Sequence, residues 1–542
     1  MLPAAAKAVS DTLDFARRHA DRLRNGKNPY LHGNYAPARE TAPTRVACRS
    51  GAVPADLPAG VFLRNGPNPK YAVRGLYHWF DGDGMVHALS LGGGGGAMVY
   101  TSHQVRTVKL AHEDKVGGAD GLNVGDLQGP LGLAKMALFH ARSRLGDGDV
   151  KRLLTLASGG AANTALVYHA GRLLALVESS HPTELHLASR PASLSTSGVF
   201  DFNGQLNHPF TAHPKVCPKT GEMLFFGYSV TGSPNCSYTV VDPEGRLVRT
   251  VDIGLKRKIM MHDFAITRNY SVFLDLPLCF SPDNMAKTLS GGAFKFKTRA
   301  GARIGVMPRH GSSRDEVVWI DVAPCSVFHT VNAYEEEGSG GATVVVLQAC
   351  RFPDIDLFDM NVGERQYDSN LYEWRLNVST GQLESEGPVV AKREVVGDFP
   401  QINGKYLGAR HRYTWISTFA ARENAKFDGV VKVDMWTKEV VGTLRYGARR
   451  RGGEIQFVAK ENAQSEDDGY LLGFVHDEAE GGESTFWVMD ARTMDDVPLA
   501  VVELPERVPF GFHALWVPAA KMVAAGEESS ARRGGIEVRS AL

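Results

Sequence analysis

Short apolar segments separated by tight turns recur along most of this chain, and this alternation restricts the fold more than any other feature. The turns include Lys219-Thr220-Gly221-Glu222 and Asp242-Pro243-Glu244-Gly245, which are typical connections between antiparallel strands. Glycine contributes 58 of the 542 residues, which fits many hairpins better than a helical protein. Regular strands over such a length predict an all-β propeller or a stack of sheets. The candidate strands span 166–169, 173–178, 223–228, 238–241, 343–348, 371–376, 412–418, 430–434, 470–475, 485–490 and 513–517.

The overall composition argues against several classes of protein. Its 60 basic and 60 acidic side chains balance, so we expect no nucleic-acid partner. No apolar run approaches the roughly 20 residues that span a bilayer. The six cysteines form no C-x-x-C pair and are predicted to be reduced thiols. The length allows one large core or about two to three domains, and no repeated motif indicates a number of blades.

Two segments have a helical pattern instead of a strand pattern. Residues 3–25 carry one apolar stripe with basic residues elsewhere around it, and residues 128–145 are apolar over much of the helix circumference. Helices of this kind lie in membrane interfaces, where a lipophilic substrate could be collected. Packing of each helix on its own domain explains the patterns equally well, so both interpretations stay open.

Four histidines lie beside aromatic or apolar residues at the ends of predicted strands. His262 opens a predicted hairpin over 263–276, and His213, His329 and His513 have comparable surroundings. Four imidazoles from four strand ends suggest a metal ion on an axis toward which the strands converge. Imidazole ligands suit zinc, copper, iron and nickel, so these residues alone leave the metal open. The chain has 18 histidines, and any one of them alone is more often a surface or core residue.

Three carboxylates next to apolar runs are candidates to support such a site. Glu178 follows the apolar run 174–177, Asp398 precedes Phe399, and Glu454 follows two glycines. Each needs a partner, because a buried unpaired carboxylate is energetically costly. Accepting the outer ring N–H of a metal-bound histidine is one such pairing. A structural salt bridge with an arginine is the alternative.

Seven sequence blocks resemble the carotenoid cleavage oxygenases and occur in the order of that family along nearly the whole chain. Chance does not produce seven ordered blocks of this kind, and the plant branch is the most similar. The blocks are Phe62–Pro69, His78–His87, Thr211–Lys215, His262–Thr267, Phe328–Ala333, Asp467–Leu471 and Val508–His513.

The resemblance implies both a fold and a reaction. The fold is an all-β, seven-bladed β-propeller with a helical dome formed by insertions, including about residues 118–147. Residues 1–33 would form an N-terminal amphipathic helical extension and residues 34–542 a single propeller domain. The reaction is the scission of a conjugated C=C bond to two carbonyls by non-haem Fe(II), with O2 as co-substrate.

The resemblance also implies roles for individual residues. The iron ligands of the family fall on His213, His262, His329 and His513, which were singled out above from their context. The chemistry agrees, since Fe(II) passes electron density to O2 and zinc does not, and neutral imidazoles leave coordination positions open for O2.

The supporting carboxylates of the family fall on the three acidic residues described above. Many members have glutamate in place of Asp398. We therefore expect the shorter aspartate side chain to reach His329 through a shifted backbone or a water molecule. The implied pairs are Glu178 with His262, Asp398 with His329, and Glu454 with His513.

A polyene has no polar group near its scissile bond, so an apolar tunnel with aromatic walls has to position it. Aromatic rings could also stabilise cationic character that develops along the polyene. Ordinary core packing is the alternative for most of the candidates. The predicted tunnel residues are Phe210, Phe328, Phe399, Phe457, Phe510, Phe512 and Trp516.

A plant-type carotenoid or apocarotenoid cleavage dioxygenase, in contact with a membrane through 3–25 and 128–145, is therefore the first hypothesis. The sequence around Tyr77–Phe80 is more similar to that of apocarotenoid-cleaving members, such as zaxinone synthase, than to that of 9-cis-epoxycarotenoid dioxygenases. An epoxycarotenoid dioxygenase, a retinoid isomerohydrolase on the same iron, and a non-catalytic carotenoid-binding propeller are the alternatives. We expect a monomer in the plastid, with the cytoplasm as the alternative compartment, although no transit peptide is evident.

Overall fold

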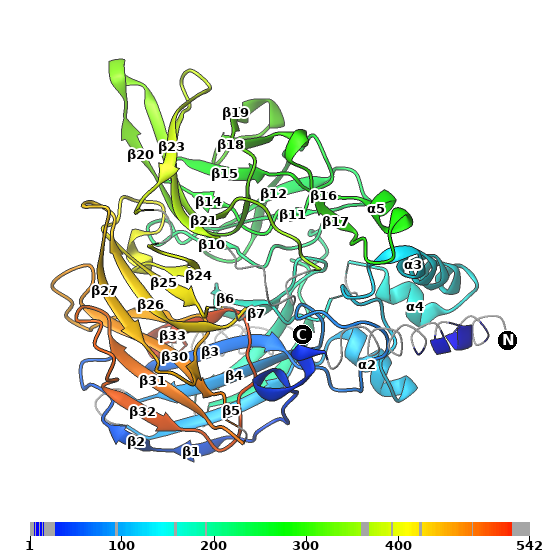
Figure 1. Cartoon of the computed structure of the whole chain (residues 1–542), viewed down its shortest axis with the longest axis horizontal. Helices are drawn as coiled ribbons and strands as arrows, with labels where there is room; N and C mark the ends of the chain where they lie inside the picture. The colour runs from blue at the N-terminus through cyan, green and yellow to red at the C-terminus, as the bar shows by residue number, and fades with distance from the viewer. Residues whose placement is uncertain are drawn as a thin grey trace, which may run out of the picture.

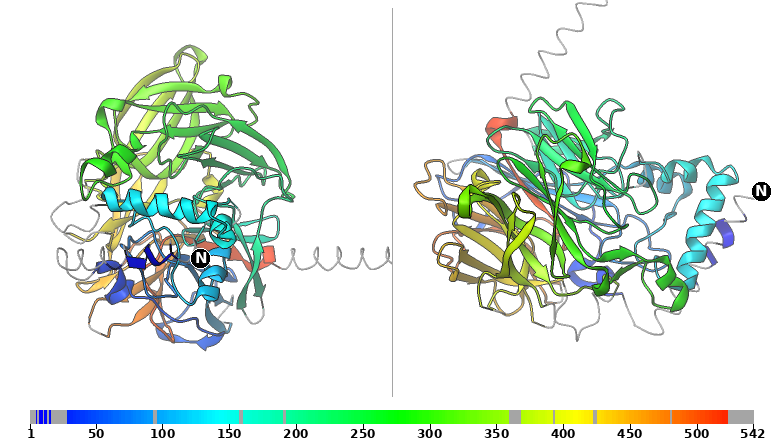
Figure 2. Two further views of the ribbon diagram at one scale, coloured as in Figure 1. Left: turned by 90° about the vertical axis from the view of Figure 1, so that its right-hand side faces the viewer. Right: turned by 90° about the horizontal axis from the view of Figure 1, so that it is seen from above.

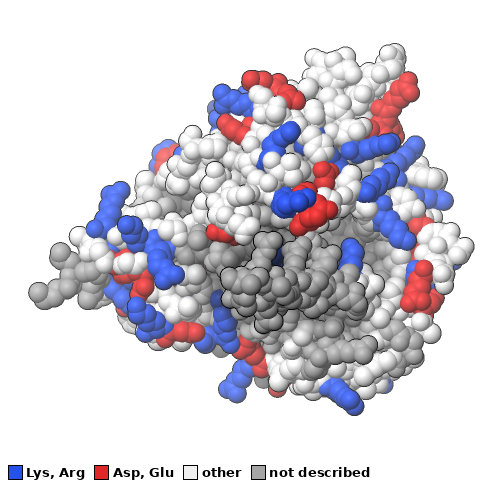
Figure 3. Space-filling model, turned by 180° about the vertical axis from the view of Figure 1, so that it is seen from behind, with Lys and Arg blue, Asp and Glu red and all other residues white. Residues whose placement is uncertain are grey.

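Strands arranged around a common axis are the main secondary structure of the computed structural model (Figure 1). The structure describes residues 5, 7–9, 11–12, 15, 28–92, 96–156, 160–189, 192–358, 368–391, 394–421, 425–479 and 481–522. The expected helix over 3–25 lies largely outside these residues. Basic and acidic side chains are interspersed over the face in Figure 3, in keeping with the balanced charge.

Five of the propeller blades are formed by consecutive antiparallel strands, with the first strand of each innermost. We number the blades in chain order from 1 to 7, and these are blades 2 to 6. Blade 2 contains β6 (Ala165–His169), β7 (Arg172–Leu176), β8 (Thr183–Ser189) and β9 (Ala192–Val199). Blade 3 contains β10 (Lys215–Val216), β11 (Met223–Tyr228), β12 (Cys236–Val241) and β13 (Leu247–Asp252). Blade 4 contains β14 (Ala265–Ile266), β15 (Tyr270–Asp275), β18 (Ala302–Pro308) and β19 (Val318–Val322). Blade 5 contains β20 (Ser326–Glu337), β21 (Thr343–Phe352), β22 (Asn370–Asn377) and β23 (Gln382–Pro388). Blade 6 contains β24 (Gly397–Gln401), β25 (Tyr413–Phe419), β26 (Phe427–Asp434) and β27 (Glu439–Arg445).

The two remaining blades join distant parts of the chain and close the ring. Blade 1 has β33 (Ala514–Pro518) innermost, followed by β3 (Gly60–Pro67), β4 (Gly84–Leu91), β5 (Met98–Gln104) and β1 (Thr44–Val46). Blade 7 contains β28 (Arg450–Arg451), β29 (Gln456–Ala459), β30 (Gly469–Asp477), β31 (Ser484–Asp490), β32 (Ala500–Glu503) and, outermost, β2 (Cys48–Gly51). The prediction of a seven-bladed β-propeller is confirmed.

The cores lie between adjacent blades, and burial follows the position of a strand in its blade. Every residue of β3, the second strand of blade 1, is buried, because both faces of this strand are covered by side chains. The outer strand β27 alternates between exposed and less exposed residues, as expected when one face meets solvent. All six cysteines are free thiols, as predicted.

The helices gather on one side of the propeller, where α3 runs along the surface (Figure 2). They are α2 (Val108–Val116), α3 (Gly129–Arg144), α4 (Gly148–Leu153) and α5 (Pro282–Lys287), and the hairpin of β16 (Leu278–Phe280) and β17 (Phe294–Phe296) precedes and follows α5. Short 3-10 helices are η1 (Pro29–Leu31), η2 (Gly33–Tyr35), η4 (Thr298–Ala300), η5 (Arg314–Glu316), η6 (Ser339–Gly341) and η7 (Gly404–Tyr406). Within the described ranges, no helix has the length and apolar character needed to cross a bilayer.

Candidate metal centre

The four predicted histidine ligands meet at the axis of the propeller. His213, His262 and His513 precede the inner strands of blades 3, 4 and 1, and His329 lies near the start of the inner strand of blade 5. Because the inner strands of a propeller surround one channel, residues at their starts face each other. One ring nitrogen from each histidine lies within 4.8 Å of the other three.

The spacing of these nitrogens fits a single transition-metal ion. The Nε2 atom of His262 lies 2.9 Å from Nε2 of His213 and 3.3 Å from Nε2 of His329. A metal–imidazole bond of about 2.1 Å puts two ligands at right angles about 3 Å apart. A set of imidazoles without carboxylate or thiolate suits the ions from iron to zinc in the transition series.

Three of the four rings are supported by a carboxylate on their outer side. At His329 and His513 the Nδ1–H donates to the carboxylate, which leaves the Nε2 lone pair directed toward the centre. The Nδ1 atom of His262 contacts Oε1 of Glu178, His329 lies 3.0 Å from Oδ1 of Asp398, and His513 lies 3.1 Å from Oε1 of Glu454. Glu178 follows β7 in blade 2, Asp398 lies in β24 of blade 6, and Glu454 precedes β29 of blade 7. Each of the seven blades therefore contributes one side chain to the centre.

Further hydrogen bonds hold two of these carboxylates. The Tyr228 hydroxyl donates to Oε2 of Glu178 at 2.8 Å. The backbone N–H of Ala514 donates to Oε2 of Glu454 at 2.5 Å, and Nε2 of Gln401 donates to Oε1 at 3.2 Å. Sequence reasoning missed Tyr228 and Gln401, since neither lies close in the chain to the carboxylate it supports.

The electrostatic surroundings differ among the rings. Burial, reinforced by the other imidazoles, lowers the pKa of His213 well below its ordinary value. Burial also lowers the pKa of His513, and Glu454 opposes this only in part. At His329 burial acts in the same direction, but the Asp398 carboxylate outweighs it and raises the pKa. His213 and His513 therefore present neutral rings, the form that a metal ion requires.

Asp263 is a buried residue beside the histidines that the sequence analysis missed. Its Oδ2 atom accepts from the backbone N–H and the hydroxyl of Thr330, at 2.8 and 2.7 Å. Its Oδ1 atom forms an ion pair with Lys215 at 2.7 Å. Since Lys215, Asp263 and Thr330 follow three of the histidines closely in sequence, this network ties blades 3, 4 and 5 together beside the centre. An aspartate directly after a candidate ligand was the available signal.

Two of the predicted tunnel residues contact the histidine rings. Phe328 packs edge-on against His262 with ring centroids 5.4 Å apart. Phe399 lies 5.2 Å from the rings of both His329 and His513.

Two further predicted residues belong to a buried aromatic cluster. Phe510 contacts Tyr35 with centroids 4.8 Å apart, and Phe512 contacts Trp79 at 4.7 Å.

The other three predicted tunnel residues pack between blades, and their role in a tunnel stays a prediction. Phe210 stacks on Phe225 at 4.0 Å, and Phe457 stacks on Trp415 at 4.6 Å. Trp516 packs against the core shared by blades 1 and 7. Each side chain points between blades, where burial of a large ring stabilises the fold, and none contacts the histidines.

Three aromatic residues that were not predicted connect Phe328 to Phe399. Ring centroids are 5.8 Å apart for Phe328 and Phe352, 6.4 Å for Phe352 and Phe419, and 5.1 Å for Phe419 and Phe427. Phe427 in turn lies 5.1 Å from Phe399. These rings form a continuous apolar wall on one side of the metal centre.

The model of a protein family described as retinal pigment epithelial membrane protein matches residues 35–518. The chain belongs to the carotenoid cleavage oxygenase family. Within that family it is 41% identical over 505 residues to carotenoid 9,10(9',10')-cleavage dioxygenase 1 of Arabidopsis thaliana, covering 90% of this chain and 89% of the relative. It is 35% identical over 489 residues to the chloroplastic 9-cis-epoxycarotenoid dioxygenase NCED6 of the same plant, covering 90% and 81%. These relatives confirm the prediction that the protein is an oxygenase enzyme.

Two solved structures show the same fold. Lignostilbene dioxygenase of Pseudomonas brassicacearum superposes with a TM-score of 0.76 at 24% identity, covering 91% of this chain and 99% of that one. Cobalt-substituted Synechocystis ACO superposes with a TM-score of 0.72 at 25% identity, covering 89% and 97%.

Proposed function

We propose that this protein is a non-haem Fe(II), O2-dependent dioxygenase that cleaves one conjugated C=C bond of a carotenoid or apocarotenoid to two carbonyl products. The convergence of four Nε2 atoms, three of them oriented by carboxylates, supports this proposal most directly. When bound, Fe(II) supplies the electron density that activates O2.

The residues around the centre perform the remaining tasks. Glu178, Asp398 and Glu454 keep each ring in the tautomer whose Nε2 faces inward. The wall from Phe328 to Phe399 gives an extended apolar substrate a surface to lie on and keeps water away from the reacting double bond. The three carboxylates face the outer edges of the histidine rings, so they are not placed to hydrogen-bond a substrate. Selection among substrates therefore depends on their shape more than on hydrogen bonds.

Scission of a 9,10 double bond is the proposed regiochemistry. Relatives named for 9,10(9',10') cleavage are 38–41% identical to this chain, and the epoxycarotenoid dioxygenases NCED6 and NCED1 are 35% and 36% identical. An apocarotenoid substrate, as in the zaxinone synthase-like prediction, remains a hypothesis for the same site. Assays with a panel of full-length carotenoids and apocarotenoids distinguish these two substrate classes, because the products differ in length.

The test loads metal-free protein anaerobically with Fe(II), adds substrate and O2, and identifies the products. Paired carbonyl products that carry oxygen from 18O2 are expected, and the same protein loaded with Zn(II) should yield none. His213→Ala should lose bound iron and activity, whereas the exposed His186→Ala is the matched control that keeps both. Isomerised alcohol without O2 consumption would favour an isomerohydrolase. Bound pigment with no iron would favour a carotenoid-binding protein.

We also propose that α3 contacts a membrane, because it directs two of its basic side chains inward and exposes an apolar side chain. Lys135 and Arg142 face inward and form buried ion pairs with Asp126 and Asp120 at 2.6 and 2.7 Å. Leu131 is 44% exposed at the outer surface. Further exposed apolar side chains lie on the neighbouring elements: Val116, Leu145, Leu154 and Leu289. Such a surface fits the apolar interior of a lipid monolayer.

Sedimentation with phosphatidylcholine vesicles tests the membrane proposal. Parent protein should pellet with the vesicles, and Leu131→Glu combined with Leu145→Glu should remain in the supernatant with unchanged secondary structure. Val497→Glu, which replaces an apolar side chain that is 79% exposed on blade 7, is the matched control and should pellet like the parent. Equal sedimentation of the double variant and the parent would contradict the proposal.

The remaining proposals concern organisation and location. We propose an extension over 1–33, a propeller domain over 34–542 with an insert at about 118–147, and a monomer, to be tested by limited proteolysis and light scattering. We propose the plastid as the compartment, since the epoxycarotenoid relatives are named chloroplastic. The names of the 9,10-cleaving relatives carry no compartment, so the cytoplasm is the competing outcome of a fluorescent-fusion experiment.

A further inference from the structure

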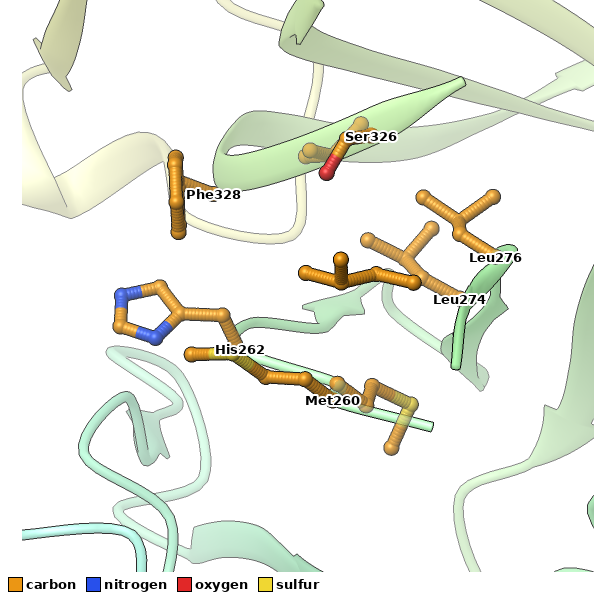
Figure 4. A pocket seen from close by; sticks show the side chains of 9 residues that line it. Met260, His262, Leu274, Leu276, Ser326 and Phe328 are labelled. Carbon is orange, nitrogen blue, oxygen red and sulfur yellow. The ribbon is translucent and has the colours of Figure 1, made fainter. Parts of the chain in front are cut away.

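The four histidines of the metal centre are not all held in the same way. Three of them are each followed within two residues by a member of the network around Asp263. Side chains from blades 4 and 5, among them Leu274 and Phe328, also lie next to His262 (Figure 4). His513 is the fourth ligand, and it adjoins no member of that network in the chain. Its backbone is therefore held by other residues.

The backbone of Asn65 in β3 pairs with the segment that carries His513. The N–H of Asn65 donates to the carbonyl of His513 at 3.0 Å, and the carbonyl of Asn65 accepts from the N–H of Phe512 at 2.9 Å. These two bonds extend the ladder between β3 and β33, in which Arg64 lies opposite Ala514, past the start of β33. The location of the His513 backbone thus depends on that of Asn65.

The side chain of Asn65 fixes β3 to the neighbouring blade. It is fully buried, and its Nδ2 atom donates to the carbonyls of Ala162 and Ala165 at 2.9 and 3.1 Å. Ala165 begins β6, the inner strand of blade 2, and the N–H of His513 donates to the carbonyl of Thr164 in the same segment at 3.3 Å. Only an amide brings two N–H groups to these carbonyls, so neither aspartate nor an aliphatic residue can replace it.

The segment before His513 is in close backbone contact with β3. A Cβ atom on Gly511 would lie 2.8 Å from the carbonyl oxygen of Asn65 and 2.9 Å from Nε of Arg64. A Cβ atom on Gly66 would lie 2.7 Å from Cα of Gly511. Interiors packed this closely transmit strain, so a displacement of either segment displaces the other.

We propose that Asn65 is a positioning residue that determines where His513 enters the metal centre, an inference that rests on the metal binding in the proposed function. Glu454 orients the ring of His513 through Nδ1 but does not locate the backbone that carries it. A ligand has to lie within about 0.5 Å of its place to bind at full strength. Asn65 supplies this second requirement through its bonds to both the His513 segment and blade 2.

Titration of metal-free protein with Co(II) tests the inference without turnover. Asn65→Ala should raise the Kd about tenfold, and Gly511→Ala should do the same because its methyl group pushes the segment away from Asn65. Gln104→Ala is the matched control, since this buried amide of blade 1 also donates to two backbone carbonyls, those of Asn68 and Gly84. It should lower the free energy of unfolding in urea and leave the Kd within about twofold of the parent.

A double-mutant cycle shows whether Asn65 acts through His513. In the His513→Ala background, Asn65→Ala should change the Kd for Co(II) by less than about twofold, because the ligand that it positions is absent. Should Asn65→Ala fail to fold, Asn65→Ser, which keeps a hydroxyl donor, takes its place in the cycle.

Three results would overturn the role of Asn65 and leave the proposed function intact. They are a parent-like Kd in Asn65→Ala and Gly511→Ala, a tenfold rise in both backgrounds of the cycle, and an equal rise in Gln104→Ala. Parent protein that binds no Co(II) would instead overturn the metal centre of the proposed function, and this inference with it.

Discussion

Asp398 reaches His329 directly, with 3.0 Å between Oδ1 and Nδ1, although its side chain is one methylene shorter than glutamate. The backbone compensates for the missing methylene. Strands β24 and β25 shift register between Asp398 and Gln401, and Phe399 within this bulge has a φ of +54°. A non-glycine residue in this region is strained, so the surrounding packing has to hold it there. The bulge moves the Asp398 carboxylate inward and turns the Phe399 ring toward His329 and His513.

Asp398→Asn should weaken metal binding about 10- to 100-fold, because the amide removes the negative charge that raises the pKa of His329. Titration of metal-free protein with Co(II) measures the change. Asp398→Glu keeps the charge and should lose less affinity than the asparagine variant. Equal affinity of the asparagine variant and the parent would show that the carboxylate does not orient this ligand.

Phe210→Ala and Phe328→Ala should separate core packing from substrate contact. Phe210 is fully buried between blades, so its truncation should lower the free energy of unfolding by about 3–5 kcal/mol and leave the polyene KM of the folded fraction unchanged. Phe328 borders His262, so its truncation should lower kcat/KM about tenfold at a smaller cost in stability. Urea unfolding and steady-state kinetics on both variants check the prediction. The opposite pattern would return Phe210 to the substrate site.

Lys135→Met should destabilise the protein by about 3–5 kcal/mol, because the buried Asp126 carboxylate loses the charge that compensates it. Adding Asp126→Asn should recover part of this loss, which a double-mutant cycle measures. Lys115→Met breaks the exposed pair with Asp149 and should cost less than about 1 kcal/mol. Similar losses for Lys115→Met and Lys135→Met would contradict an inward-facing charged side of α3.

His78 should make the protein less stable as the pH falls from about 6.5 toward about 4. Burial lowers the pKa of His78 to about 4, and its Nε2–H donates to the carbonyl of Leu357 at 2.8 Å. In the unfolded chain the pKa is about 6.5, so between these values the unfolded state binds a proton that the native state does not. This favours unfolding by about 2 kcal/mol between pH 6.5 and 5.

His78→Gln retains an N–H donor and does not titrate, so it serves as the comparison for this pH dependence. Free energies of unfolding in urea at several pH values should converge for the two proteins as the pH falls, since other groups titrate alike in both. Parallel curves would show that folding does not lower the pKa of His78.

The sequence predicted the metal centre better than its surroundings, for a physical reason. Each ligand has a local signal, since a histidine beside apolar residues at a strand end is visible in a few residues. No comparable local signal in the sequence shows where an aromatic ring lies in the fold. Phe328 and Phe210 have similar sequence surroundings, yet one borders His262 and the other fills a blade core. That choice depends on which face of the strand meets the neighbouring blade.

The pairing of strands that lie far apart in the chain could not be predicted from the sequence either. Nothing near Ala514 indicates that β33 pairs with β3, in which Arg64 lies opposite Ala514. The apolar character of residues 128–145 was evident, but the inward direction of Lys135 and Arg142 depends on Asp126 and Asp120, which lie on a preceding loop.

The contribution of one residue from every blade has a consequence for the order of assembly. His513 comes late in the chain, and the strand that follows it is also the one that completes blade 1. The four imidazoles therefore meet only after this last strand has paired with β3. Capture of a metal ion is in this way coupled to closure of the ring.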